Sequence, residues 1–212
     1  MAETNSMVAE QFDSAEQQHE AALLGIWTFL ATEILFFGGL FLGYIVYRHT
    51  YHESWVVASQ QTNLLYGTIN TAILLTSSFT MALGVRAAQQ GRNQILFRYL
   101  LVTIFFAIAF MGVKAAEYTE DIREHLVPGP SFSLKGAAQG ELFFVFYWAM
   151  TGLHAIHVLV GIGVLSVMAF LAFQRRFDKD YYTPVELSGL YWHFVDIVWI
   201  FLYPLIYLIN RH

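Results

Sequence analysis

The chain has 212 residues, of which 57% are hydrophobic and only 13% charged, and its formal net charge is −5. Soluble domains carry about 25% charged residues, so this composition indicates a protein that crosses a membrane several times. The absence of cysteine excludes disulfides, thiolate metal sites and iron–sulfur clusters, and no basic stretch indicates nucleic-acid binding.

The elements follow from the apolar runs. Residues 1–22 form a polar, acidic N-terminal tail without the basic start of a signal peptide, so we expect the first apolar span to be retained. A hydrocarbon core about 30 Å thick needs about 20 apolar residues per helix. Residues 23–212 contain five such runs, and the sequence predicts an all-α fold, a polytopic bundle of five transmembrane helices. The expected helices are about 23–47, 64–85, 96–115, 141–173 and 187–209.

The basic residues predict the orientation of the bundle. Short cytoplasmic connectors are enriched in Lys and Arg, and the second and fourth connectors fit that description. The other side has its basic residues mostly in the long connector 117–141, where the rule is weaker. We therefore expect a cytoplasmic N-terminus and an outer C-terminus. The second and fourth connectors carry Arg86, Arg92, Arg98, Arg175, Arg176 and Lys179, against Arg48, Lys114, Arg123, Lys135 and Arg211 on the other side.

The first span contains an acid, Glu33, beside a seam formed by Thr32, Gly39 and Gly43. Small residues at such a seam let another helix approach closely. An acid at a helix centre costs about 2.5–3.5 kcal/mol on insertion scales, so we expect Glu33 to be buried, protonated and directed at protein. Two interpretations stay open: a hydrogen bond to a neighbouring helix, or a role in proton movement.

The fourth span carries His154 and His157, three residues apart and therefore on one helix face. A metal site needs three or four ligands, and His193 is the one further histidine that can complete a set. The simpler expectation is two buried, neutral imidazoles that bond to acids or to the backbone. In the second span, Asn70, Ser77 and Gly84 recur at heptad spacing, which predicts hydrogen bonding and close packing between helices.

The fifth span contains His193 and Asp196, one turn apart near its expected cytoplasmic start. Such a polar corner can fix neighbouring helices, hold lipid head groups or conduct protons, and periodicity does not choose among these roles. Trp192 and Trp199 have the amphipathic character of residues that anchor helices at membrane interfaces.

Five stretches together resemble subunit III of haem–copper cytochrome c oxidase, in family order and across all five spans. They are FLATEILFFGGLF (29–41), NTAILLTSSFTMALG (70–84), KAAEY (114–118), GLHAIHVLVG (152–161) and YWHFVDIVWIFLYPLIYL (191–208). The resemblance implies an accessory, non-catalytic subunit of a complex that reduces oxygen to water and pumps protons. It also implies the short, five-helix bacterial form, because the mitochondrial pattern has two helices before the one matched here.

The resemblance also implies roles for residues. Glu33 and Asp196 become candidates for proton uptake or buried acids, and His154, His157 and His193 become structural or lipid-contact candidates, as do Glu117, Arg175 and Arg176. The chain is expected to hold no metal. Haem and copper belong to the partner catalytic subunit I, subunit II and a small subunit IV are further expected partners, and phospholipid binding is compatible with the family. The expected location is the bacterial plasma membrane.

Three alternatives stay open. Quinol oxidases have a similar subunit III, and the electron donor binds elsewhere, so this sequence does not choose between cytochrome c and quinol. A small proton-coupled transporter would use Glu33 and Asp196 as carriers, but its repeated halves and broken helices are not seen in the sequence. A membrane metalloenzyme would use the three histidines.

Overall fold

The computed structural model describes residues 11–134, 139–179 and 181–209, so part of the N-terminal tail, Lys135 and Arg211 lie outside the described residues. The described residues form helices and connectors, with no strand among them. All helices except the short α2 are long and apolar enough to cross a membrane, which confirms the all-α, five-span prediction. The helices are α1 (Ala15–Thr50), α2 (His52–Ser59), α3 (Leu64–Gln89), α4 (Asn93–Arg123), α5 (Gly140–Phe173) and α6 (Thr183–Tyr207).

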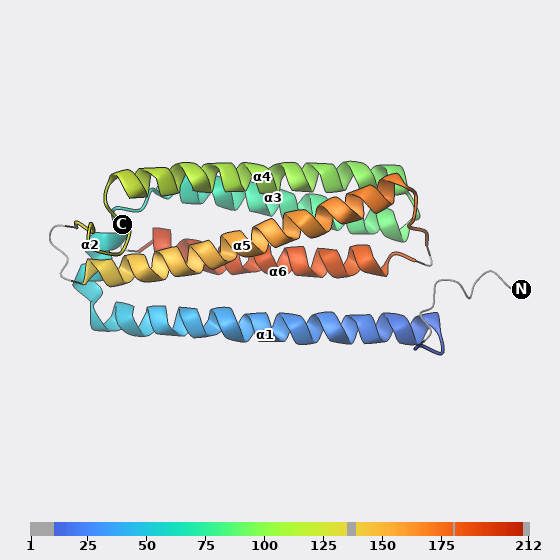
Figure 1. Ribbon diagram of the computed structural model, residues 1–212, viewed down its shortest axis with the longest axis horizontal. Helices are drawn as coiled ribbons and strands as arrows, with labels where there is room; N and C mark the ends of the chain where they lie inside the picture. The colour runs from blue at the N-terminus through green and yellow to red at the C-terminus, as the bar shows by residue number, and fades with distance from the viewer. Residues whose placement is uncertain (1–10, 135–138, 180, 210–212) are drawn as a thin grey trace, which may run out of the picture.

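The long helices run roughly alongside one another, with α3 and α4 packed closely and α5 crossing the bundle obliquely (Figure 1). α1 lies at one edge and packs on α5 and α6. Only Leu30, Phe37 and Tyr44 of α1 are buried. These residues are seven apart, so α1 touches the bundle along one narrow line.

Several helices extend beyond their expected bounds, and α3 runs to Gln89 rather than to residue 85. α1 begins at Ala15 because the Ser14 hydroxyl accepts a hydrogen bond from the Gln17 amide at 3.1 Å, which caps the helix. α4 continues to Arg123, although the acidic residues of its last turns predicted a connector between helices. α6 begins at Thr183 with a proline in its first turn, a position that suits proline. The short α2 was not expected at all.

The prediction that Trp192 and Trp199 anchor the helix at membrane interfaces is wrong. Both side chains are buried in the centre of the bundle. The Trp192 indole donates to the Ser77 hydroxyl at 3.0 Å, and the Trp199 indole donates to the Thr71 hydroxyl at 3.1 Å. The two tryptophans therefore join α6 to α3 inside the bundle, where a buried indole N–H needs a partner.

The predicted small-residue seams are partly used. Ser77 accepts the hydrogen bond of the Trp192 indole. A Cβ atom added to Gly84 would stand 3.5 Å from Tyr99 Cβ, so α3 and α4 pack closely there. Neither polar atom of the buried Asn70 side chain has a hydrogen-bond partner among the described residues. On α1, Gly43 packs on Phe146.

Candidate functional site

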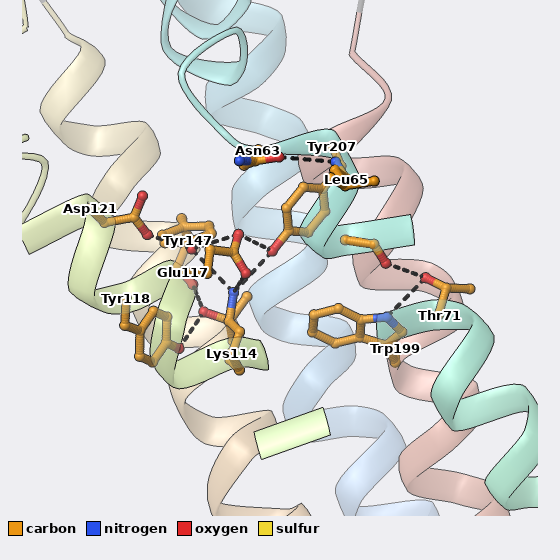
Figure 2. Close-up of polar contacts among 12 residues, drawn as sticks. Asn63, Leu65, Thr71, Lys114, Glu117, Tyr118, Asp121, Tyr147, Trp199 and Tyr207 are labelled. Carbon is orange, nitrogen blue, oxygen red and sulfur yellow. Dashed lines mark hydrogen bonds and ion pairs between the residues drawn. The ribbon is translucent and has the colours of Figure 1, made fainter. Parts of the chain in front are cut away.

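The largest buried polar group of the bundle lies on one face of α4. Lys114, Glu117 and Asp121 follow each other at i, i+3 and i+7, the spacing that aligns side chains along a helix. Tyr147 from α5 and Tyr207 from α6 complete the group (Figure 2). We refer to these five residues as the lysine–carboxylate cluster. Each is no more than 5% exposed.

The cluster satisfies its cation completely. The Lys114 ammonium group donates to Glu117 Oε2 at 2.9 Å, to the Tyr207 hydroxyl at 2.9 Å and to the Tyr147 hydroxyl at 3.1 Å. An ammonium group has three hydrogens, so each has an acceptor. The Tyr207 hydroxyl donates to Glu117 Oε1 at 2.7 Å, and the Tyr147 hydroxyl lies 2.7 Å from Asp121 Oδ2. The bonds therefore tie α4, α5 and α6 together at one end of the bundle.

Aromatic rings surround the charge. The Lys114 nitrogen lies 4.7 Å from the centroid of the Tyr118 ring, 4.6 Å from that of Tyr147 and 5.7 Å from that of Trp199. Ring faces attract cations, and the attraction grows when water is excluded. Breaking such a buried pair by removing one partner is costly, because the other charge is left without compensation. The cluster therefore holds α4, α5 and α6 together, and this role depends on all its members.

Only part of this cluster is among the predicted site residues. Glu117 is a predicted structural polar residue and is a member, whereas Lys114 is predicted only as a basic residue of the outer side, and Asp121, Tyr147 and Tyr207 are not predicted site residues. The i, i+3, i+7 spacing of the charges on α4 was the available signal. It was missed because the helix was expected to end at Ala115.

Glu33 lies on the side of the bundle between α1 and α5. Its Oε2 is 3.2 Å from His157 Nε2, and the side chains of Glu33 and His157 are 19% and 17% exposed. His157 Nδ1 is 2.8 Å from the Leu153 carbonyl. The expected contact with a neighbouring helix is therefore present, and His157 bonds to an acid and to the backbone as expected. The expectation that Glu33 is buried is wrong, because α1 packs on the bundle through Leu30 and Phe37 and leaves Glu33 at the rim.

His154 does not behave as expected. Its imidazole is fully buried, but neither ring nitrogen has a hydrogen-bond partner among the described residues. The ring lies between Phe110 and Trp199, with centroid distances of 5.5 and 5.1 Å. The prediction that both histidines bond to acids or backbone is therefore wrong for His154, which the aromatic rings enclose.

His193 and Asp196 are neighbours on α6 but do not bond to each other. His193 Nδ1 lies 2.7 Å from the Ser78 hydroxyl on α3. Asp196 is only 2% exposed, and among the described residues neither of its oxygens has a partner at hydrogen-bond geometry. The pair therefore occupies the α3–α6 interface, with His193 as the residue that bonds across it.

The remaining candidates, Arg175 and Arg176, are exposed just beyond the end of α5. Across the described ranges, no three His, Cys, Asp or Glu side chains are grouped so that they could hold a metal ion. His193 bonds to Ser78, His157 contacts Glu33 and the Leu153 carbonyl, and His154 is enclosed by aromatic rings, so the three histidines of the metalloenzyme alternative are not grouped in one site.

These features define a class of protein: a polytopic helical membrane protein whose internal polar groups join helices rather than converge on a redox centre. The family model for cytochrome c oxidase subunit III matches residues 11–211. This chain belongs to the cytochrome c oxidase subunit III family.

Relatives from several bacteria support the same assignment. Cytochrome c oxidase subunit 3 of Thermostichus vulcanus is 31% identical over 202 residues, which cover 94% of this chain and 92% of the relative. The Corynebacterium diphtheriae protein of that name is 33% identical over 211 residues, 96% of each chain. The probable cytochrome c oxidase subunit 3 of Nocardia farcinica is 34% identical over 190 residues, 87% of this chain and 85% of the relative. The alignments with these relatives thus cover nearly the whole chain.

Proposed function

We propose that this chain is the accessory subunit III of a terminal haem–copper cytochrome c oxidase, a complex that reduces oxygen to water and pumps protons. The match to the subunit III family over residues 11–211 carries the proposal. The haem and copper belong to the catalytic subunit I, and subunit II and a small subunit IV complete the complex. The chain itself is non-catalytic.

The donor groups of this chain support a role without its own redox centre. His154 is enclosed by rings, and both nitrogens of His157 face other groups. Axial haem ligands approach from opposite sides of the ring plane, and neighbouring histidines on one helix cannot both do so. The residues therefore do not fit a haem or copper site, and no chemical step is assigned to one.

The subunit stabilises the catalytic subunit and supports proton uptake. Glu33 is the acid best suited to exchange a proton, because it is at the rim of the bundle and has an imidazole 3.2 Å away. Asp196 is enclosed, which suits a packing role better. We place the chain in the bacterial plasma membrane with its N-terminus cytoplasmic, because the basic connectors follow α3 and α5. Membrane phospholipid is its other partner.

Purification of the tagged chain in a mild detergent tests this function. The expected result is co-purification of larger subunits with the absorption bands of haem, in stoichiometric amounts and with oxygen consumption driven by reduced cytochrome c. Cells that express the untagged chain provide the control for non-specific capture. A colourless homo-oligomer without partner subunits would contradict the proposal and favour the transporter alternative.

A further inference from the structure

A stack of aromatic rings leads from the surface of the bundle to the lysine–carboxylate cluster. The indole of Trp148 on α5 and the ring of Tyr118 on α4 are both partly exposed, and they stack with centroids 4.2 Å apart and an interplanar angle of 27°. The ring centroid of the fully buried Tyr147 is 6.2 Å from that of Tyr118 and 6.0 Å from that of Trp148. A partly exposed pair of rings thus adjoins a buried phenol of the cluster, and Figure 2 shows Tyr118 and Tyr147 beside Lys114.

The chemistry of these rings suggests a role beyond packing. The chain contains no cysteine, so phenol and indole rings are its groups that lose a single electron most readily. A phenol that loses an electron also tends to lose its hydroxyl proton, because the charged ring makes the O–H group a strong acid. The electron therefore leaves most easily where a base lies within hydrogen-bond reach of that proton. The hydroxyl partner of each ring decides where an oxidising equivalent can stop.

The two outer rings have no such base. The Tyr118 hydroxyl lies 2.7 Å from the Thr151 hydroxyl, and the Trp148 indole donates to the Leu126 carbonyl at 3.3 Å. A hydroxyl group and a peptide carbonyl accept hydrogen bonds, but neither holds a transferred proton well. An electron lost from Trp148 or Tyr118 is therefore replaced by an electron from the next ring, and the oxidising equivalent moves inwards.

The inner ring, Tyr147, has a base at its hydroxyl group. This hydroxyl lies 2.7 Å from Asp121 Oδ2 and 3.1 Å from Glu117 Oε1, and it accepts a hydrogen bond from Lys114 at 3.1 Å. Glu117 is paired with the Lys114 ammonium group at 2.9 Å, whereas no ion pair of the described residues includes Asp121. Asp121 is both the nearer carboxyl group and the one without a bound cation, so it is the better acceptor of the Tyr147 proton.

The charge balance of the cluster favours this transfer. Two carboxyl groups share one ammonium group in a buried site. With both carboxyl groups ionised, the cluster carries one excess negative charge, and uncompensated buried charge is costly. Proton uptake by Asp121 leaves the balanced pair of Lys114 and Glu117. Loss of an electron from Tyr147 therefore removes a net charge from the bundle instead of adding one.

We propose that the stack of Trp148, Tyr118 and Tyr147 takes up oxidising equivalents from oxygen-derived radicals in the membrane and holds them at Tyr147. An organic peroxyl radical accepts one electron through Trp148 and Tyr118 and, with a proton from water, becomes a hydroperoxide. At Tyr147 the O–H bond breaks and an O–H bond forms at Asp121 Oδ2, which leaves a neutral phenoxyl radical. One electron from a donor of the quinol class and the proton held by Asp121 then restore the phenol. This activity belongs to side chains of this chain and does not rest on the identity of the complex.

Photo-oxidation of the full-length chain in mild detergent tests the proposal. A ruthenium tris-bipyridine sensitiser with a cobalt(III) ammine acceptor supplies the one-electron oxidant, and electron paramagnetic resonance of samples frozen at set delays records the radicals. We expect a tyrosyl signal that outlasts the signals of exposed rings and that forms more slowly in heavy water, because a proton moves with the electron. Tyr147→Phe should abolish this long-lived signal. Asp121→Asn keeps a hydrogen-bond acceptor but no longer takes up the proton, and it should abolish the signal as well.

Two further variants keep the test independent of folding. Trp148→Phe leaves the bonds of the cluster intact and should slow formation of the signal without shortening its lifetime. Tyr44→Phe is the matched control, because Tyr44 is a fully buried tyrosine whose hydroxyl donates to the Leu205 carbonyl rather than to a carboxyl group. It should give the signal of the parent. Three results would each overturn the proposal: no long-lived tyrosyl signal in the parent, an undiminished signal in Tyr147→Phe or Asp121→Asn, or a rate of formation in Trp148→Phe equal to that of the parent.

Discussion

Trp192 of α6 lies directly against Gly161 of α5: a Cβ atom added to Gly161 would stand 2.6 Å from Trp192 Cζ3. The same indole donates to Ser77 of α3. One side chain therefore connects three helices, by close contact on one side and by a hydrogen bond on the other. The contact requires a residue without a side chain at position 161.

Gly161→Ala should destabilise the bundle by about 1–3 kcal/mol, the usual cost of overpacking a well-filled core. The thermal unfolding midpoint of the detergent-purified chain measures this. Gly163→Ala is the matched control, because that position on the same helix has no neighbour within 4 Å, and alanine favours a helix. Equal unfolding midpoints for the two variants would contradict the prediction and show that Trp192 can move to accommodate a methyl group at position 161.

Removal of the buried cation should be among the most damaging single changes. Lys114→Met leaves Glu117 and Asp121 buried without their counter-charge, and we expect a loss of about 3–5 kcal/mol in unfolding free energy. The exposed Lys179 gives a control with the same chemical change, Lys179→Met, which should stay close to the parent. A Lys114→Met chain as stable as that control would mean that the cluster does not lock the helices.

Glu33→Gln should leave assembly of the complex largely intact. An amide oxygen or nitrogen at this position can still bond to His157, 3.2 Å away. Glu33→Leu removes that capacity and should lower the yield of assembled complex. The yield of haem-containing complex per tagged chain measures both variants. Failure of Glu33→Gln to assemble would indicate that the Glu33 charge itself is required.

Asp196 and Ser77 should respond differently to substitution. Asp196→Asn should cost less unfolding free energy than Ser77→Ala, because the amide has nearly the shape of the carboxyl group and can still contact the Ser78 hydroxyl beside it. Ser77→Ala leaves the buried Trp192 indole without its acceptor and should cost about 1–3 kcal/mol. Chemical denaturation of the two variants side by side provides the measurement. A large loss for Asp196→Asn would reveal a bond that the carboxyl group makes.

The spans were predictable because a lipid environment imposes both length and apolarity on a helix. The expected start of α3 and the end of α5 coincide with the structure. The end of α4 was not predicted, because charged residues in a sequence normally mark the end of an apolar span. Hydropathy treats Glu117 and Asp121 as water-facing, whereas both are compensated inside the bundle by Lys114 and two tyrosines.

The pairings across helices were harder to predict than the helices. Which side chain meets which depends on how each helix is rotated about its axis, and the all-round apolarity of these spans leaves that rotation weakly determined. Trp192 and Trp199 illustrate the result, since their composition suggests an interface but their hydroxyl partners on α3 lie in the core. The exposure of Glu33 likewise depends on how α1 packs, which its sequence alone does not specify.

The attachment of α1 along Leu30, Phe37 and Tyr44 has a consequence for how the molecule opens. Free energies of partial opening are lowest where few apolar contacts must be broken. α1 is therefore expected to have the lowest opening free energy of the long helices. Its backbone amides should exchange with solvent deuterium before those of α3 and α4. Local separation of this one helix, rather than melting of the whole bundle, is the first event on the unfolding pathway.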